Sequence, residues 1–577
     1  MNIMIIDLAN KTTTLQPVRD PLIGGRLLTV QLTLQHINPQ TDPLGSGNVL
    51  IFANGPLAGC RVSTAGRLSV GGKSPLTNGI KESNAGGMAG DSLAALGYRA
   101  LVFKNILPDG QPSLFILDEK GGRFENAQQY WGMGNEELSQ RLHKDYGEDY
   151  AIISIGPAGE QQMRAAGLAV TDANNKPFRL AARGGMGAVM GSKRLKAVLI
   201  RKLAKNFQMP ISKEARQAIV AFNKHVAVSP RIQVLREYGT ASTVMLVQKL
   251  GGMVVRNFSR GEFEHAENIS GEKLTELIRA RGGVGTPTEF CMAGCVIQCS
   301  NVFPDEEGKL AAAPVEFETI GLCGANLELK TFDDIARINR LCNDLGLDTI
   351  EIGAALGVMM EAAELGNDLP EPYQKDQLPR FGDAARAAEL VAEIGKGTPL
   401  GKLLGNGVVA TGQALGSKRI PAVKGQAMSA YDPRVIKGTG VTYVTSPQGA
   451  DHTAGLTVFA PVDHKDKTNA VALSRSAQLQ RAAYDALGLC VFNLSATGQR
   501  PDLIIQMLNL IYQKDLPESW LDELGLEVIK SEIDFNKQAG LTANDNRIPA
   551  FFKNEPIPPT NCTFDIADEE LDQIWNK

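Results

Sequence analysis

Short β-rich runs alternate with turn residues over the first 205 positions of the chain. The runs Asn48–Ala53, Arg99–Phe103, Leu114–Leu117 and Ala197–Ile200 are separated by Gly, Pro and Asn. These three residue types favour turns between strands. The pattern predicts a β-rich N-terminal domain, which we place at residues 1–205.

After about residue 206 the spacing of apolar residues becomes helical. Helical spacing occurs at Glu214–His225, Ile232–Glu237, Gly271–Ala280, Phe332–Ala363, Ala384–Ile394 and Gly401–Leu415. We place a second boundary near Lys418–Lys424, and further helices are expected at Ser474–Leu487, Pro501–Tyr512 and Pro517–Ala539. The expected fold class is therefore α+β, with two mainly α-helical domains, 206–417 and 418–577, after the sheet domain.

Length, charge and hydropathy exclude some classes of function. A chain of 577 residues exceeds what one hydrophobic core usually organises, which agrees with several structural units. The net charge of -4 gives no general reason to expect nucleic acid as a partner. No run of about 18 apolar residues occurs, and the N-terminus lacks a basic stretch followed by an apolar one. We expect a soluble, cytoplasmic protein without membrane insertion.

Three of the eight cysteines lie close together in the sequence. The segment Phe290–Ser300 reads FCMAGCVIQCS, so three residues separate each of Cys291, Cys295 and Cys299 from the next. A cubane iron-sulfur cluster needs four thiolates, and one loop can supply three of them. Two alternatives remain: a zinc site, although no second CxxC pair or nearby histidine exists, and three buried cysteines on one face of a helix.

A short design occurs twice, each time at the end of a predicted helix. Asn343–Asp348 reads NDLGLD and Asp485–Cys490 reads DALGLC. In each copy the glycine fits the left-handed position that ends a helix. Asp348 is placed to cap the following helix, with Glu351 as its capping-box partner. Helix punctuation explains either copy alone, whereas two copies suit a ligand with two similar halves that are met by backbone amides.

At these residues the chain resembles the aldehyde ferredoxin oxidoreductase family, and the similarity runs over essentially its whole length. Further matching strings are TAGRLSVGGKSPLTNG at Thr64–Gly79, ESNAGG at Glu82–Gly87, IGPAGE at Ile155–Glu160 and AARGGMGAVMGSKRLKA at Ala181–Ala197. The resemblance implies an oxygen-sensitive catalytic subunit whose N-terminal sheet domain holds a tungsten or molybdenum bis-pterin. It also implies one [4Fe-4S] cluster, and it allows Mg²⁺ between the pterin phosphates.

The resemblance assigns the ligands of both groups. It makes Cys490 the fourth cluster ligand, beside Cys291, Cys295 and Cys299. The implied cofactor contacts are Arg67, Asn84, Gly86, Ala181, Ala182, Arg183, Gly184, Asn343, Leu347, Asp348, Asp485, Gly488 and Leu489. Independently, arginines can offer forked donors to phosphates, and glycines permit close backbone approach. The chain departs from the family pattern at two places. Many relatives have two residues between the first two cysteines, where this chain has three, and Asn343 replaces an aspartate.

The resemblance also implies the groups on the open side of the metal. The segment PVEFET resembles a family stretch P-E-Y-E-T, so Glu318 is the first choice for a catalytic glutamate and Glu316 the second. The histidine falls at His452 in SPQGADHTAG, with His464 in APVDHKD as its rival. Tyr431 in SAYDPR matches the tyrosine that lines the substrate pocket in relatives.

The implied reaction is the two-electron oxidation of a small aldehyde, with water, to a carboxylic acid. His452 or Glu318 would remove a proton from the water or the hydrate, and Tyr431 would orient the carbonyl. The chain has no convincing nicotinamide fingerprint, so a ferredoxin or a ferredoxin-like subunit is the expected acceptor. Alternatives are low-potential reduction of a carboxylate or an aromatic thioester, and a non-catalytic iron-sulfur electron carrier.

Some relatives bridge two subunits with a metal held by glutamate and histidine in the helical domain. No histidine occurs between His265 and His452. We therefore expect any homodimer to form without that bridging metal. The sequence leaves open the choice between tungsten and molybdenum, the aldehyde and the oligomeric state.

Overall fold

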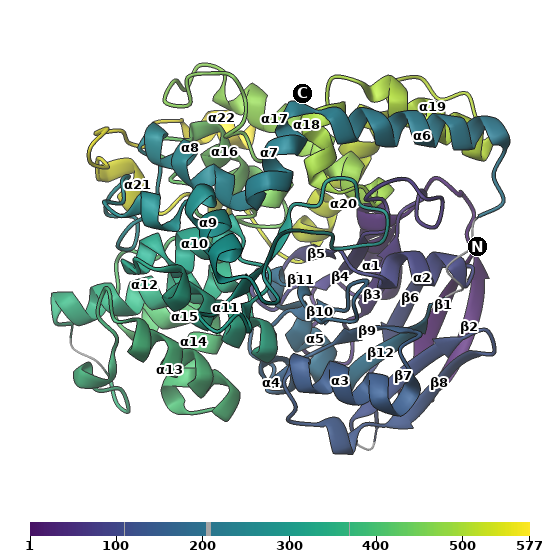
Figure 1. The fold of residues 1–577 in the computed structure, drawn as a ribbon, viewed down its shortest axis with the longest axis horizontal. Coiled ribbons are helices and arrows are strands. Elements are labelled where there is room, and N and C mark those ends of the chain that lie inside the picture. Colours follow the sequence, from purple (N-terminus) through teal and green to yellow (C-terminus); the bar gives the residue numbers. More distant parts are fainter. Residues whose placement is uncertain (109, 203–208, 368–369, 577) are drawn as a thin grey trace.

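The computed structural model describes residues 1–108, 110–202, 209–367 and 370–576. Its fold is α+β, as the sequence pattern predicts: strands β1 to β12 all lie between Asn2 and Arg201, and helices dominate after that. Figure 1 shows the strands gathered on one side of the molecule and the later helices beside and above them. The predicted domain boundary at 205/206 lies outside the described residues.

The first sheet has the order β2-β1-β6-β3-β4-β5. Only β1 and β6 run parallel, and the other neighbours are antiparallel. Its strands, with the two helices between them, are β1 (Asn2–Asp7), β2 (Thr12–Pro17), α1 (Gly25–His36), β3 (Leu50–Asn54), β4 (Leu68–Lys73), β5 (Ile80–Ala85), α2 (Ala89–Ala95) and β6 (Tyr98–Lys104).

The second sheet repeats this topology with the next six strands. Its order is β11-β10-β9-β12-β7-β8, and again a single pair, β7 with β12, is parallel. The elements are β7 (Ser113–Asp118), β8 (Gly121–Asn126), α3 (Asn135–Tyr146), β9 (Tyr150–Ser154), α4 (Pro157–Glu160), β10 (Leu168–Val170), β11 (Arg179–Ala181), α5 (Met186–Ser192) and β12 (Leu195–Arg201). The N-terminal domain therefore has two halves of one design.

Alternating side chains on the central strands build two different cores. On β6, Leu101 and Phe103 join a core with the second sheet, α2 and α5, whereas Ala100 and Val102 face α1 and α17 (Ala470–Leu487). Phe103 meets Phe115 of β7 edge to face, with 5.2 Å between ring centroids. Successive strand residues point to opposite faces, so strands covered on both faces are apolar throughout. The four runs predicted as strands lie on β3, β6, β7 and β12 and are confirmed.

The middle of the chain is mainly helical, as predicted. Its helices are α6 (Lys213–Val228), α7 (Pro230–Tyr238), α8 (Thr243–Leu250), α9 (Gly271–Arg281), α10 (Phe317–Cys323), α11 (Phe332–Leu345), α12 (Thr349–Leu365), α13 (Ala384–Lys396), α14 (Pro399–Gly405) and α15 (Gly407–Ala414). A small sheet of β13 (Thr286–Glu289), β14 (Ser300–Pro304) and β15 (Leu310–Ala312), which the sequence pattern missed, interrupts them.

The last part adds further helices after a short hairpin. Its elements are β16 (Ala422–Val423), β17 (Gln426–Ala427), α16 (Lys437–Thr445), α17, α18 (Leu494–Thr497), α19 (Pro501–Tyr512), α20 (Trp520–Gln538), α21 (Ala550–Asn554) and α22 (Asp568–Asp572). Helix α19 packs on α6, and α17 and α20 both pack on α1, so this part returns to the N-terminal domain. Among the described residues, no helix is both long and apolar enough to cross a bilayer.

Candidate active site

Both copies of the repeated motif form the helix end that the sequence predicts. Helix α11 ends at Gly346 and α17 at Gly488, with φ angles of 74° and 72°. The amide of Leu347 donates to the carbonyl of Cys342 at 2.8 Å, and that of Leu489 donates to Tyr484 at 2.9 Å. This pairing, with glycine left-handed, is the Schellman motif.

The two helix ends abut equivalent loops of the N-terminal domain. A Cβ added at Gly55, just after β3, would lie 2.0 Å from the carbonyl oxygen of Leu487. One added at Gly156, shortly after β9, would lie 2.4 Å from that of Leu345. Both positions therefore require glycine, because no side chain fits between loop and helix end. The repeated sheets and the repeated motifs form one arrangement with two similar halves.

Asp348 caps α12, as predicted. The prediction that Glu351 is its capping-box partner is wrong. The carboxylate of Asp348 accepts from the amide of Ile350 at 2.9 Å, as expected of an N-cap. Glu351 instead accepts from the amides of Val408 and Ala427, both at 2.9 Å. Burial raises the pKa of Glu351 to about 7. The carboxyl is used by distant segments, which sequence spacing could not indicate.

Arg183 joins the first motif to two other parts of the chain. Its Nε donates to Asp348 at 3.2 Å, and its two terminal nitrogens donate to the carbonyls of Ala450 at 2.7 Å and Ala427 at 2.5 Å. Gly184, next to it, has a left-handed φ of 80° and leaves no room for a Cβ against Lys81. Arg183 follows Ala181 and Ala182 at the end of β11, and β11 contacts β5 of the other sheet.

Arg67 and Asn84 lie in the half of the arrangement that contains the second motif. Arg67 donates through Nε to the side chain of Asn84 and through Nη2 to its carbonyl at 3.1 Å. The Asn84 amide donates to Glu82 at 3.2 Å. Burial lowers the pKa of Arg67, but the charges of Cys490, Cys291, Asp485 and Glu82 together outweigh it, so the net shift is upward. Arg67 therefore lies between the second motif and the cysteine loop.

Asn343 makes a hydrogen bond that requires the donor of its side-chain amide. Its Nδ2 donates to the carbonyl of Ala313 at 3.0 Å, in the segment before α10. An ionised aspartate could not donate there. The departure from the family pattern thus coincides with a hydrogen bond that only the amide can make.

The second motif is surrounded by charged residues that sequence reasoning missed. Arg26 binds Glu532 through two hydrogen bonds of 2.8 Å and lies 3.4 Å from Asp485. Arg481 lies one helical turn before Asp485, and its Nε donates to the carbonyl of Thr453 at 2.8 Å. This spacing of four residues on one helix was a signal in the sequence, whereas the Arg26–Glu532 pair had none.

The three grouped cysteines lie in the loop between β13 and β14, so the alternative of three cysteines on one helix is wrong. A hydrogen bond with Cys295, supported by Arg179 and Arg67, lowers the pKa of Cys291 to about 6. Gly86 approaches this loop closely, because a Cβ there would lie 3.0 Å from the Cys291 sulfur. Two arginines next to a buried thiol favour its thiolate form.

Cys490 lies in the same neighbourhood, although it comes far later in the chain. Burial raises the pKa values of Cys490 and Cys299, and the Cys291 thiol raises both further. All eight cysteines are free. Within the described ranges, no three His, Cys, Asp or Glu side chains converge closely enough for a single metal ion. The donor set of four soft sulfurs, three of them from one loop, fits a cubane cluster.

Glu318, His452 and Tyr431 come together from α10, η7 (His452–Ala454) and the loop before α16. The His452 Nε2 lies 3.5 Å from Glu318 Oε1, and the other Glu318 oxygen accepts from the amide of Ala430 at 2.8 Å. The His452 Nδ1 shares a hydrogen bond of 3.1 Å with the hydroxyl of Ser429. The ring centroids of Tyr431 and His452 are 6.3 Å apart.

Burial sets the protonation state of this group. It lowers the pKa of His452 to about 3, and the nearby cations, Arg183 first, act in the same direction. It raises the pKa of Glu318 to about 8. Near neutral pH the histidine is therefore neutral, and most Glu318 side chains carry a proton. Such a separation of pKa values is typical of acid-base sites.

The two candidate glutamates point to different places. Glu316 accepts a hydrogen bond from Thr240, and burial raises its pKa. The charged groups around it are Arg179, Cys291 and Arg67, so it faces the cysteine loop. Glu316 precedes α10 with extended backbone, φ −103° and ψ 157°, whereas Glu318 lies in its first turn. Only Glu318 lies beside His452.

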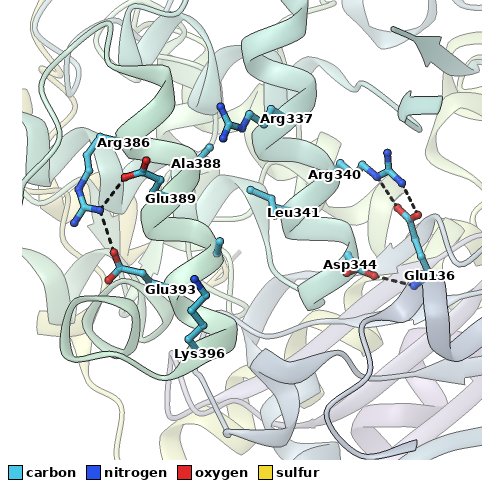
Figure 2. A pocket seen from close by; sticks show the side chains of 11 residues that line it. Glu136, Arg337, Arg340, Leu341, Asp344, Arg386, Ala388, Glu389, Glu393 and Lys396 are labelled. Atoms are coloured by element: carbon cyan, nitrogen blue, oxygen red, sulfur yellow. Dashed lines mark hydrogen bonds and ion pairs between the residues drawn. The ribbon is translucent and has the colours of Figure 1, made fainter. Parts of the chain in front are cut away.

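Two surface pockets formed by described residues lie away from this group. His464, the rival histidine, lines a small pocket of about 170 Å³ together with Val462 and Asp463. A larger pocket of about 560 Å³ lies between the outer faces of α11 and α13 (Figure 2). There Arg340 binds Glu136 of α3, and Arg386 binds Glu389 and Glu393. None of the residues predicted as catalytic from the family pattern lines the larger pocket.

Buried polar atoms without partners indicate what the region between the motifs can hold. Among the described residues, Arg481 Nη1 and Glu318 Oε1 are buried and make no hydrogen bond. Burial lowers the pKa of Arg481, and Asp485 and Cys490 offset only part of that effect. A buried cation without a close anion is costly, so the residues fit an anionic group such as a phosphate-bearing pterin.

Comparison with known proteins agrees with this arrangement. A model of the aldehyde ferredoxin oxidoreductase N-terminal domain matches residues 3–202, and a model of domains 2 and 3 of the same protein matches residues 217–576. The chain belongs to the aldehyde ferredoxin oxidoreductase family. It is thus an oxidoreductase, as the sequence motifs predicted, and its two-part match covers the sheet domain and the helical domains.

Individual relatives in the family extend over most of the chain. The tungsten-containing aldehyde ferredoxin oxidoreductase of Pyrococcus furiosus is 30% identical over 558 residues, 93% of this chain and 88% of that protein. The enzyme of the same name from Thermococcus kodakarensis is 31% identical over the same shares. An aliphatic sulfonate oxidoreductase, WOR-like subunit, of Pyrococcus furiosus is 26% identical over 88% of this chain and 80% of its own length.

A solved structure shows the same fold. The active-site complex BamBC of benzoyl coenzyme A reductase, in complex with 1,5-dienoyl-CoA, superposes with a TM-score of 0.81 at 18% identity. The match covers 99% of this chain and 92% of that chain. The chain therefore shares its overall fold with that complex.

Proposed function

We propose that this chain oxidises an aldehyde to a carboxylic acid on a tungsten or molybdenum bis-pterin and passes the electrons out through a [4Fe-4S] cluster. The observation that carries the proposal is the placement of Glu318, His452 and Tyr431 next to Arg183, which is bound to the first motif. The tungsten-containing relatives, which match over 93% of the chain, support the metal.

The cofactor would lie between the two motifs, with its anionic groups near Arg67, Arg183 and Arg481. When bound, it supplies a metal centre that exchanges two electrons with the substrate. Asn84 on β5 and Ala181 on β11 lie on edge strands of the two sheets that contact each other. Residues at these two positions would hold a Mg²⁺ ion that neutralises phosphate charge.

The cluster would be held by the four cysteines of the loop and the second motif. Arg67 connects the two regions, since the charges of Cys291, Cys490 and Asp485 all act on its pKa. Arg67 would therefore lie between the bound cofactor and the cluster. A cluster carries one electron at a time, so a ferredoxin or a ferredoxin-like subunit is the acceptor we expect.

Glu318 is the better proton acceptor of the two candidate bases. A general base works best when its pKa lies near the working pH, and burial raises the pKa of Glu318 to about 8. His452, whose pKa burial lowers to about 3, holds a proton too weakly. Its neutral ring would orient water, and the buried phenol of Tyr431 would donate a hydrogen bond to the carbonyl oxygen.

The proposed reaction balances with two one-electron acceptors. One aldehyde and one water give one carboxylic acid, two protons and two electrons. Glu318 receives a proton from the attacking water and releases it to solvent. The two electrons leave singly and reduce two oxidised ferredoxin-type clusters.

One observation favours the reverse direction as a second candidate. Because its pKa is raised to about 8, Glu318 is protonated in most molecules at neutral pH and can act as a proton donor. Low-potential reduction of a carboxylate or an aromatic thioester needs such a donor. Assays with a low-potential reductant and with an oxidising dye would show which direction the loaded enzyme supports.

The direct test is aldehyde-dependent dye reduction by anaerobically purified protein of known metal content. The proposal expects turnover by the natural chain and loss of turnover in Glu318→Gln with tungsten or molybdenum retained. Glu316→Gln serves as the matched control, since it lies two residues away and faces the cysteine loop. Full activity in Glu318→Gln would remove the assigned role.

A further inference from the structure

An arginine and an exposed aromatic ring lie at one edge of the candidate active site. Arg231, in the first turn of α7, stacks on the ring of Phe459, with 4.4 Å between the guanidinium carbon and the ring centroid. Phe459 belongs to the loop between η7 and α17 and follows His452 by seven residues. It is 45% exposed, so this pair is in contact with solvent.

Arg231 also lies near the buried site. The charges of Arg231 and of the Tyr431 hydroxyl each act on the pKa of the other, which places the two side chains in one electrostatic neighbourhood. Tyr431 in turn packs on Phe317 at 5.1 Å and on His452 at 6.3 Å between ring centroids. From solvent inward, the order is therefore Phe459, Arg231, Tyr431 and then the pair of His452 and Glu318.

Arg231 lacks the anion that other partly buried cations here possess. In the part of the chain that the structure describes, no Asp or Glu oxygen lies within 4.0 Å of its guanidinium nitrogens. By contrast Arg183 binds Asp348, Lys81 binds Asp451, and Arg256 binds Glu328. Burial lowers the pKa of Arg231, yet an arginine stays charged at any pH a protein meets.

A guanidinium that stacks on an aromatic ring keeps its edge free for hydrogen bonds. Its planar fork matches a carboxylate, sulfonate or phosphate with two parallel bonds. Inside the site, the carboxylate beside His452 belongs to Asp451, which is already paired with Lys81. A substrate that brings its own anion would supply the missing partner.

We propose that Arg231 binds an oxyanion on the far end of the substrate, so that the preferred substrates are aldehydes carrying a carboxylate or sulfonate. Phe459 holds the guanidinium flat, and Tyr431 holds the carbonyl end. This inference rests on the proposed aldehyde oxidation and adds the substrate class to it. It assigns specificity to Arg231 and no part in the chemical step.

The test compares charged and neutral aldehydes with one metal-loaded preparation of each variant. Succinate semialdehyde is paired with butanal, and sulfoacetaldehyde with acetaldehyde. In the natural chain, kcat/KM should favour the charged member of each pair. Arg231→Met should lower kcat/KM for the charged members about 10- to 100-fold, mostly through KM, and leave the neutral ones unchanged. Arg231→Lys should restore part of the preference.

Two further variants separate specificity from structure. Phe459→Leu removes the ring under the guanidinium and should weaken the preference less than Arg231→Met does. Arg216→Met on the exposed face of α6 removes a matched positive charge and should leave both pairs unchanged. Preference for only one anion would show whether carboxylate or sulfonate is the natural group.

The outcomes distinguish this inference from the proposed function. If the natural chain oxidises neutral and charged aldehydes equally, or if Arg231→Met preserves the preference, the inference is overturned while aldehyde oxidation stands. If the loaded chain oxidises no aldehyde, the proposed function fails. The anion site is then tested by calorimetric binding of succinate, which Arg231→Met must weaken if Arg231 binds oxyanions, and equal binding would overturn the inference.

Discussion

Arg481 provides a direct test of the cofactor site. Its buried charge should destabilise the unloaded protein and should stabilise a bound anionic cofactor. Its side chain is buried, its Nη1 has no hydrogen-bond partner among the described residues, and burial lowers its pKa. Arg481→Met keeps much of the volume and removes the charge. The variant should therefore fold at least as stably without cofactor as the natural chain does.

The loaded protein should respond in the opposite way. A hydrogen bond to a charged group contributes about 1.5–3 kcal/mol, which corresponds to about 10- to 150-fold weaker binding of the cofactor. Tungsten or molybdenum per chain and the fluorescence of released, oxidised pterin should both fall. The gain in melting temperature on loading should shrink.

Two other arginines serve as controls for Arg481→Met. Arg26→Met removes a buried cation that is already paired with Glu532, so it should destabilise the unloaded protein strongly. Arg500→Met removes an exposed cation on the loop before α19 and should change neither quantity. The reasoning is refuted if Arg481→Met carries full metal and pterin and shows the natural gain in melting temperature.

The remaining predictions concern the acid-base group and the cluster. With Glu318 as base, kcat/KM should rise with pH through an apparent pKa of about 8, since only its ionised form accepts a proton; a fall over that range would identify Glu318 as the acid instead. Glu318→Gln should lower kcat about 100- to 10,000-fold with metal content unchanged, and metal loss would point to a structural role. Cys295→Ser should lower iron per chain and the visible absorption of the cluster while the sheet domain stays folded, as circular dichroism can show; an unchanged iron content would contradict its place as a ligand. His452→Asn should retain metal and lose activity less severely than Glu318→Gln, and the reverse order in activity measurements would exchange their roles.

Interactions between neighbouring residues explain why the two helix ends of the repeated motif could be predicted. Gly346 and Gly488 end their helices as the sequence indicated, because the left-handed cap and the returning leucine depend on neighbouring residues alone. The helical range Phe332–Ala363 consists of two helices, α11 and α12, that meet at this cap, as the motif predicted. Likewise the helix predicted over Gly401–Leu415 is α14 and α15 with a break at Asn406.

Long-range pairing explains what could not be predicted. Glu351 was expected to serve its own helix but accepts hydrogen bonds from Val408 and Ala427, and Arg26 pairs with Glu532 across almost the whole chain. The repeat of the two sheets was also hidden, because strands buried on both faces lose the alternation of polar and apolar residues.

The choice between Glu316 and Glu318 depended on backbone conformation. The extended residue Glu316 and the helical residue Glu318 point to different regions, and their spacing in the sequence does not reveal this. The resemblance to the family named both, and the geometry favours Glu318 for the acid-base role.

The measurement that tests the central claim most directly is elemental analysis of anaerobically purified protein from a host that makes the cofactor. We expect one tungsten or molybdenum and about four iron atoms per chain, together with aldehyde-dependent dye reduction. About four iron atoms with neither tungsten nor molybdenum would contradict the catalytic assignment and favour an electron carrier.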